Sequence, residues 1–132
     1  MEKIKYILLI FSFFLLSVSN IFADNLTLLV TSNVNGEIDP CGWPKKPLGG
    51  LARKATIVDN LVNDGLEPLI LDSGNLFYKK DILDPGVEIE TAKINAEIIL
   101  ESYNKIGCHA FSPGSFDFAA GYDNILALYN DS

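Results

Sequence analysis

The chain has 132 residues, with 10 Lys and Arg, 17 Asp and Glu and one His, which gives a formal net charge of −7 at pH 7. This length suits one domain at most. An acidic chain repels phosphate backbones, so the composition argues against nucleic-acid binding. It also gives no help in attracting anionic substrates, unless a bound metal reverses the local field.

The N-terminal residues have the layout of a secretory signal peptide. A basic stretch over residues 1–5 precedes an apolar run over residues 6–18, and Ala23 offers a small residue for cleavage. An uncleaved membrane anchor is the alternative, but the run is shorter than the roughly 20 residues that a spanning helix needs. We therefore expect a signal peptide over residues 1–23 and an exported domain over residues 24–132. It would be periplasmic, in the cell envelope or secreted, and held at a membrane only if the segment stays uncleaved.

The mature chain begins with a predicted strand and helix. Residues 26–32 are rich in apolar and β-branched side chains and predict a buried strand. A loop with many prolines and glycines follows over residues 33–50. Residues 51–63 predict a helix whose apolar face carries Leu51, Ala55, Val58, Leu61 and Val62. The polar residues expected to point away from that face are Arg53, Lys54, Asp59 and Asn60.

The second half continues the alternation. Strands are predicted over residues 68–72 and 109–112, and an exposed loop over residues 79–86. A helix is predicted over residues 88–106 and the start of a third helix over residues 123–129. The apolar positions of the 88–106 helix include Ala92, Ile98, Ile99 and Ile106, and Gly107 ends it.

Strands that alternate with helices predict an α/β fold with a parallel sheet and right-handed crossovers. In such sheets ligands bind beyond the carboxyl ends of the strands. The ends of the three predicted strands carry Asn33 and Asn35, residues 72–75, and residues 112–115. We expect these segments to converge on one crevice.

Four ordered segments of the chain resemble the calcineurin-like metallophosphoesterases, in particular their exported 5′-nucleotidase branch. The first strand, "LTLLVTSNVNG", is similar to the family strand that ends in Asp-x-His-Gly. The helix start "GGLARKATIVDNL" resembles the family's Gly-Gly-Leu-Ala-Arg segment, and "LILDSGNLF" resembles Leu-Asp-Ala-Gly-Asp-Leu-Phe. The last segment, "KIGCHAFSPGSFDFAAGYDNILAL", resembles the family segment that contains Gly-Asn-His-Glu-Phe-Asp.

The resemblance implies a site for two divalent metal ions that activate water and polarise a phosphoryl oxygen. At the matching positions, Asn33 replaces a family Asp, Asn35 replaces a His and Asn75 replaces the bridging Asp. Ser115 replaces an Asn, and Phe116 replaces a helper His. Neutral amides are much weaker metal ligands than carboxylate or imidazole. We therefore expect no bound metal or other cofactor and no catalytic residue.

Other polar residues near the strand ends have structural explanations. Asp72 is expected to cap the turn that follows its strand rather than to bind metal. His109 lies at the wrong end of its strand for the crevice and is expected on the surface or in packing. Trp43 is either a docking anchor for a partner or sugar, or a residue that packs over its loop. Solvated loop charges are expected at Lys45, Lys46, Lys79 and Lys80.

Two features remain open on the sequence alone. Cys41 and Cys108 could pair as a disulfide in an exported protein, or could be a loop thiol and a buried thiol. Gly49 and Gly50 permit close packing at the start of a helix, and that helix N-terminus could alternatively bind an anion.

The family fold is a four-layer sandwich with two sheets, and the chain matches only its first half. The family's remaining histidine ligands would lie beyond the end of the chain, so a truncated domain is expected. Three functions follow from this pattern. The first is a catalytically inactive relative that binds a ligand, binds a protein partner or associates with itself through an exposed sheet edge. The second is a phosphohydrolase, acting on nucleotides or other phosphomonoesters, whose site is atypical or completed by another chain. The third is a non-functional gene fragment.

Overall fold

The computed structural model describes residues 5, 26–42, 45 and 48–130. The predicted signal peptide, apart from Lys5, lies outside these residues, as do Trp43 and Lys46. In chain order the elements are β1 (Leu28–Thr31), α2 (Leu51–Asn63), β2 (Leu69–Asp72), α3 (Val87–Ile106), β3 (Ala110–Phe111), the 3-10 helix η1 (Ser115–Phe118) and α4 (Tyr122–Asn130). None of the helices in this part of the chain is long and apolar enough to cross a membrane.

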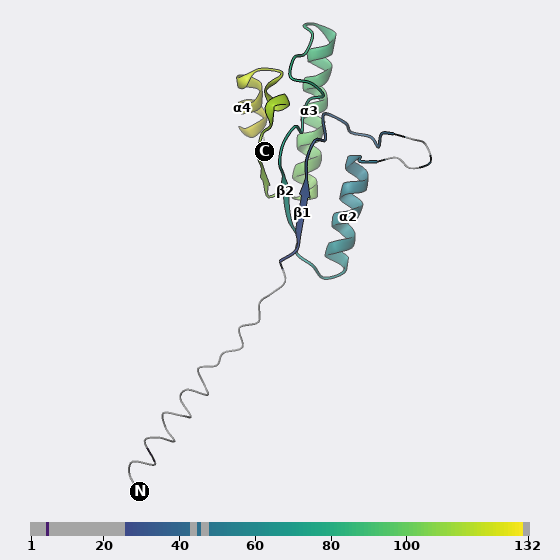
Figure 1. Ribbon diagram of the computed structural model, residues 1–132, viewed down its shortest axis with the longest axis vertical. Coiled ribbons are helices and arrows are strands. Elements are labelled where there is room, and N and C mark those ends of the chain that lie inside the picture. Colours follow the sequence, from purple (N-terminus) through teal and green to yellow (C-terminus); the bar gives the residue numbers. More distant parts are fainter. Residues whose placement is uncertain (1–4, 6–25, 43–44, 46–47, 131–132) are drawn as a thin grey trace.

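The three strands form one parallel sheet in the order β1-β2-β3 (Figure 1). The predicted α/β fold with alternating strands and helices is thus confirmed at this level. The strands are shorter than expected, since β3 has only two residues. The helix η1 was not predicted. It forms because the chain after β3 turns at Gly114 and bends around the carboxylate of Asp117.

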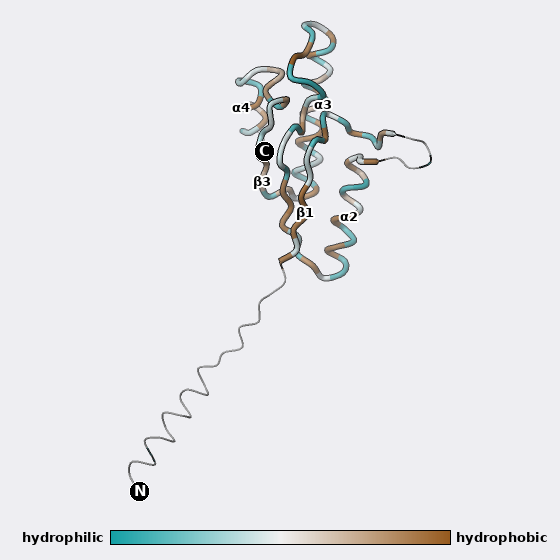
Figure 2. The backbone as a smooth tube through the Cα atoms, in the orientation of Figure 1, coloured by the Kyte–Doolittle hydropathy of each residue, from teal (hydrophilic) through white to brown (hydrophobic). Residues whose placement is uncertain are grey.

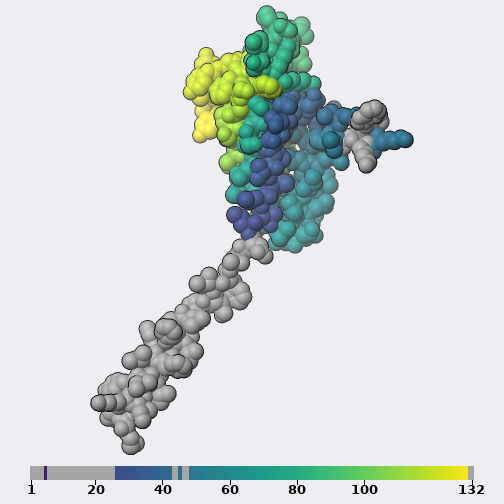
Figure 3. Space-filling view, viewed as in Figure 1, coloured from purple at the N-terminus to yellow at the C-terminus, as the bar shows by residue number. Residues whose placement is uncertain are grey.

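The two faces of the sheet differ. On one face, Ile70 and Asp72 are buried beneath α2 and α3, which pack against each other. On the other face, alternate residues of neighbouring strands come together by register: Leu28, Val30, Leu69, Leu71 and Ala110. This second face, which we call the open face, has no described helix over it, and Leu28 and Val30 are 54% and 59% exposed. Figure 2 shows, in brown, the hydrophobic residues along β1, and Figure 3 shows the β1 segment, in dark blue, uncovered in this view.

The core lies between the covered face of the sheet and the helices. Its buried residues are Leu51, Leu76, Phe77, Tyr78, Ala96, Ile99, Tyr103, Ile125 and Leu128. Two predicted helix positions are wrong, because Val62 is 56% exposed and Ile98 is 41% exposed. A four-residue strand spans about 13 Å, whereas the 13 residues of α2 span about 20 Å. The last turn of α2, which carries Val62, therefore extends past the short sheet.

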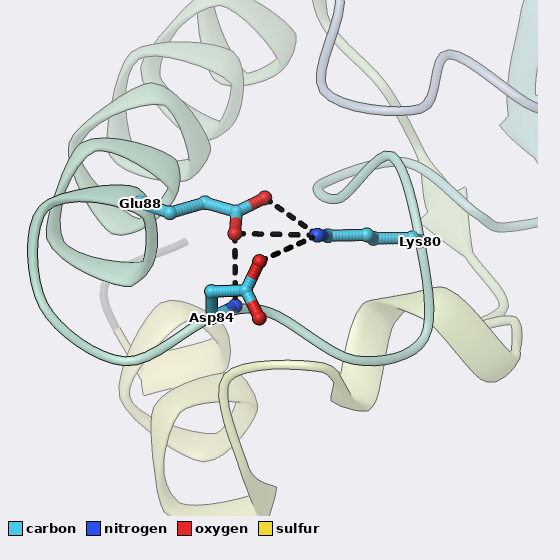
Figure 4. A network of polar contacts seen from close by, with 3 residues as sticks. All are labelled: Lys80, Asp84 and Glu88. Carbon is cyan, nitrogen blue, oxygen red and sulfur yellow. Dashed lines mark hydrogen bonds and ion pairs between the residues drawn. The ribbon is translucent and has the colours of Figure 1, made fainter.

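The loop over residues 79–86 is held by a small ionic network at its surface (Figure 4). Lys80 Nζ lies 2.9 Å from Glu88 Oε1 and 3.4 Å from Asp84 Oδ2. Glu88 also accepts a hydrogen bond of 2.9 Å from the backbone N–H of Asp84, just before α3 begins. The hydrogen bond with Glu88 raises the pKa of Lys80. Lys80 is therefore paired rather than simply solvated.

Candidate functional site

The carboxyl ends of β1 and β2 are joined by backbone hydrogen bonds. Asn33 N donates to Gly74 O at 2.9 Å, and Asn35 N donates to Asn75 O at 2.7 Å. The segment after β3 joins them, because Phe116 N donates to Asn75 Oδ1 at 3.1 Å. The predicted convergence of the three strand ends is confirmed.

All three asparagines adopt left-handed backbone conformations. The φ angles are 54° at Asn33, 53° at Asn35 and 53° at Asn75. Asparagine tolerates this conformation better than almost any other residue with a side chain, so backbone geometry contributes to its presence here. Aspartate tolerates it similarly. The backbone therefore does not explain why these positions carry no charge.

The amide of Asn75 uses both of its functional atoms within the site. Its Nδ2 donates to Asn33 Oδ1 at 2.9 Å, and its Oδ1 accepts the N–H of Phe116. Because Oδ1 faces an N–H group, the other atom must be the donor. A group that bridges two cations has to present oxygen lone pairs to both of them, and here one side presents hydrogens instead. This donor set does not fit the pair of metal ions that the resemblance implies.

Ser115 and Phe116 contribute little through their side chains. Ser115 is exposed, and Phe116, which is partly buried, reaches the site with its backbone N–H. The neighbouring Gly114 is required by close approach, since a Cβ there would lie 2.7 Å from Asn75 N. The third strand end thus serves to hold Asn75 in place.

Asp72 has the structural role that was expected. It is 3% exposed, and its Oδ1 accepts the N–H of Gly74 at 2.9 Å, which caps the turn after β2. Its Oδ2 also accepts the hydroxyls of Thr31, at 2.5 Å, and Tyr103, at 2.8 Å. Three hydrogen bonds therefore compensate for the burial of this side chain.

The prediction that Lys54 points away from the core is wrong. Its Nζ donates to Thr31 Oγ1 at 3.0 Å and lies 3.7 Å from the centre of the Tyr103 ring. The spacing explains this placement, because Lys54 lies three residues after Leu51 and four before Val58, on the buried stripe of α2. The charged residue type, not the helical spacing, misled the prediction.

Asp117 holds the strand ends together and was missed in the sequence. It is completely buried. Its Oδ1 accepts the N–H groups of Leu76 and Phe77 at 2.7 and 2.8 Å, and its Oδ2 accepts that of Gly114 at 2.8 Å. The spacing from Gly114 to Asp117 matches that of an N-terminal helix cap and its third residue, which is the signal that could have identified it.

A cavity of about 650 Å³ opens beside the end of β1. Of the five family-matched positions, only Asn33 and Asn35 line it. Asn35 Oδ1 is buried and has no hydrogen-bond partner among the described residues. Other lining residues are Thr31, Glu37, Asp39, Gly49, Gly50, Lys54, Lys79 and Tyr103. Lys79, which was expected to be a solvated loop charge, is exposed, and its Nζ lies 2.7 Å from Glu37 Oε1.

The histidine and the cysteines lie outside this arrangement or at its border. His109 is exposed, and its Nδ1 accepts the N–H of Ile70 in β2 at 3.1 Å, which agrees with the surface or packing role expected for it. Cys41 lines the cavity and pairs through its backbone with Leu48. Burial raises the pKa of the Cys108 thiol. Both thiols are free in this structure, and their pairing stays a prediction.

Across residues 26–42, 45 and 48–130, no three His, Cys, Asp or Glu side chains gather in a way that could hold a metal ion. A scan against protein-family models and a search of curated proteins gave no match for this chain.

Proposed function

We propose that the chain is an exported, catalytically inactive relative of the calcineurin-like metallophosphoesterases, of the 5′-nucleotidase branch, that works by binding. The four sequence segments support the relationship, and the order of strands and helices is compatible with the first half of the family's four-layer sandwich. In this proposal the strand ends keep the family's framework after the loss of its metal chemistry.

The observation that carries the proposal is the engagement of Asn75. A dinuclear site brings four positive charges into one crevice, and carboxylates are needed to offset them. Asn75 is neutral, donates to Asn33 and accepts from Phe116, so the position that would bridge the metals is closed by hydrogen bonds. Without a metal, no group at the strand ends would lower the pKa of water toward neutrality.

Two surfaces support a binding role. The open face is aliphatic, and its five defining residues carry no charge, which suits a protein partner or a second copy of the chain. The cavity beside β1 is lined by amides, hydroxyls and charged groups and suits a small polar ligand. An exposed strand edge at β1 adds a further route to association.

The test is metal analysis together with a phosphate-release assay on the purified chain. We expect no stoichiometric transition metal, and no hydrolysis of a nucleoside monophosphate or a generic phosphomonoester above background. About two metal ions per chain with chelator-sensitive turnover would instead support the phosphohydrolase alternative. A chain that neither accumulates nor unfolds cooperatively would support the gene-fragment alternative.

A pair of variants makes the test sharper. Asn75→Asp places an acceptor opposite Asn33 Oδ1, so it should destabilise the metal-free chain, and added Zn²⁺ should recover part of that loss. Asn60→Asp makes the same charge change on the exposed side of α2 and should respond to neither. Thermal unfolding with and without Zn²⁺ measures both. Equal responses of the two variants would show that the crevice has no special relation to metal.

A further inference from the structure

Lys54 differs from the other lysines whose contacts are described. The ammonium groups of those lysines pair with carboxylates at the surface: Lys79, Lys80, Lys93 and Lys105. The Nζ of Lys54 instead donates to a neutral hydroxyl, that of Thr31, in the wall of the 650 Å³ cavity. It is therefore an amine held inside a site of ligand size.

The surroundings fix the position of this amine. Thr31 Oγ1 accepts from Lys54 at 3.0 Å and donates to Asp72 Oδ2 at 2.5 Å. Tyr103 places its ring 3.7 Å from Nζ and donates its hydroxyl to the same Asp72 oxygen. The Thr31 hydroxyl thus connects the amine to a buried carboxylate, and this link can pass a proton to and from the cavity wall.

Burial increases the fraction of neutral amine at Lys54. Burial lowers the pKa of Lys54, and the negative charge of Asp72 and the thiol of Cys108 oppose this effect only in part. The other charged residues that line the cavity are Glu37, Asp39 and Lys79. A desolvated lysine of this kind is a better nucleophile at neutral pH than a solvated one.

We propose that Lys54 is a carbonyl-reactive amine and that the cavity beside β1 accepts a small aldehyde or ketone. The neutral Nζ attacks the carbonyl carbon, and a proton moves from nitrogen to the carbonyl oxygen. The resulting carbinolamine loses water, and a carbon–nitrogen double bond remains between ligand and lysine. No oxidant, reductant or metal is needed for these steps, so the proposal does not depend on the proposed relationship to metallophosphoesterases.

The test is reductive labelling of the full chain with propionaldehyde, a neutral probe, in the presence of cyanoborohydride near neutral pH. Mass-spectrometric peptide mapping then follows each lysine with time. We expect Lys54 to be labelled several-fold faster than Lys93 and Lys105, and its rate to rise at a lower pH than theirs. Lys54→Arg should remove the fast site, and Lys105→Arg should leave it unchanged.

The same labelling in concentrated urea is the matched control, because unfolding should bring Lys54 to the rate of the other lysines. Labelling of the folded chain at Lys54 that is no faster than at Lys105 would overturn the proposal. So would a fast site that persists in Lys54→Arg.

Discussion

Replacing Asp117 with alanine should destabilise the fold more than any other single change at the strand ends. The carboxylate is fully buried and accepts three backbone N–H groups, from Leu76, Phe77 and Gly114. Alanine would leave all three donors without their acceptor. Water can reach only those donors that the surrounding loops expose, and Leu76 and Phe77 are themselves buried.

The expected magnitude follows from these contacts. A buried donor left without a partner costs about 1–3 kcal/mol, so three of them should cost about 3–5 kcal/mol after local relaxation. That is a large part of the roughly 5–15 kcal/mol by which domains are stable. Asp117→Asn keeps the shape and the acceptor for Leu76 and Phe77 but turns a donor toward Gly114, so it should cost about 1–3 kcal/mol.

Urea unfolding followed by circular dichroism is the assay. With a slope of about 1–3 kcal/mol per molar urea, Asp117→Ala should lower the midpoint by about 1–5 M without changing the slope. Asp59→Asn, which removes the same charge from an exposed position of α2, should change stability by less than about 0.5 kcal/mol. A cost below about 1 kcal/mol for Asp117→Ala would refute this reasoning. If that variant does not fold, Asp117→Asn still tests the ranking.

Three further outcomes are expected. Tyr103→Phe removes the hydroxyl that donates to Asp72 and should cost about 1–2 kcal/mol in urea unfolding. Leu28→Lys places a charge on the open face and should shift the chain toward monomer in sedimentation velocity. Burial raises the pKa of Tyr78 from 10.0 to about 12, so the folded chain keeps this proton where the unfolded chain has lost it. Its contribution to stability is therefore complete below pH 10 and is lost as the pH rises toward 12, which unfolding at a series of pH values measures.

Each of these outcomes has a matched control. Tyr122→Phe, at a residue 64% exposed, should change stability by less than about 0.5 kcal/mol. Ile82→Lys, in the loop over residues 79–86 and away from the open face, should leave the sedimentation pattern unchanged. Tyr78→Phe should flatten the loss of stability between pH 10 and 12. If Leu28→Lys and Ile82→Lys act alike, the open face is not the associating surface.

The order of elements could be predicted from the sequence because it depends on local periodicity and on turn residues. The convergence of the strand ends followed from the parallel arrangement alone. Exposure at Val62 and Ile98 could not be read in the same way. At Val62 it depends on how far α2 extends beyond a sheet whose strands proved shorter than the apolar runs suggested. At Ile98 it depends on the side of α3 on which the residue lies, because Ala96, Ile99 and Tyr103 around it are buried.

The contacts within the candidate site were harder to predict because they join residues about 40 positions apart. The amide pair of Asn33 and Asn75 and the clamp around Asp117 both arise only when separate loops meet. Lys54 shows a different limit. Its helical spacing indicated burial and its charge indicated exposure, and the spacing prevailed because Thr31 and Tyr103 provide polar and aromatic partners.

Asn35 is followed by Gly36, so the strand ends contain a sequence that is prone to deamidation. Asparagine followed by glycine loses ammonia through a five-membered ring, in which the backbone nitrogen of the glycine attacks the side-chain carbonyl. In the folded chain Gly36 N is committed to Leu76 O at 2.9 Å, and Asn35 Oδ1 is buried. Ring closure therefore has to wait until these loops separate. The rate of deamidation at Asn35 would therefore report how often these loops separate. Each event would leave a new negative charge beside Glu37 in the cavity.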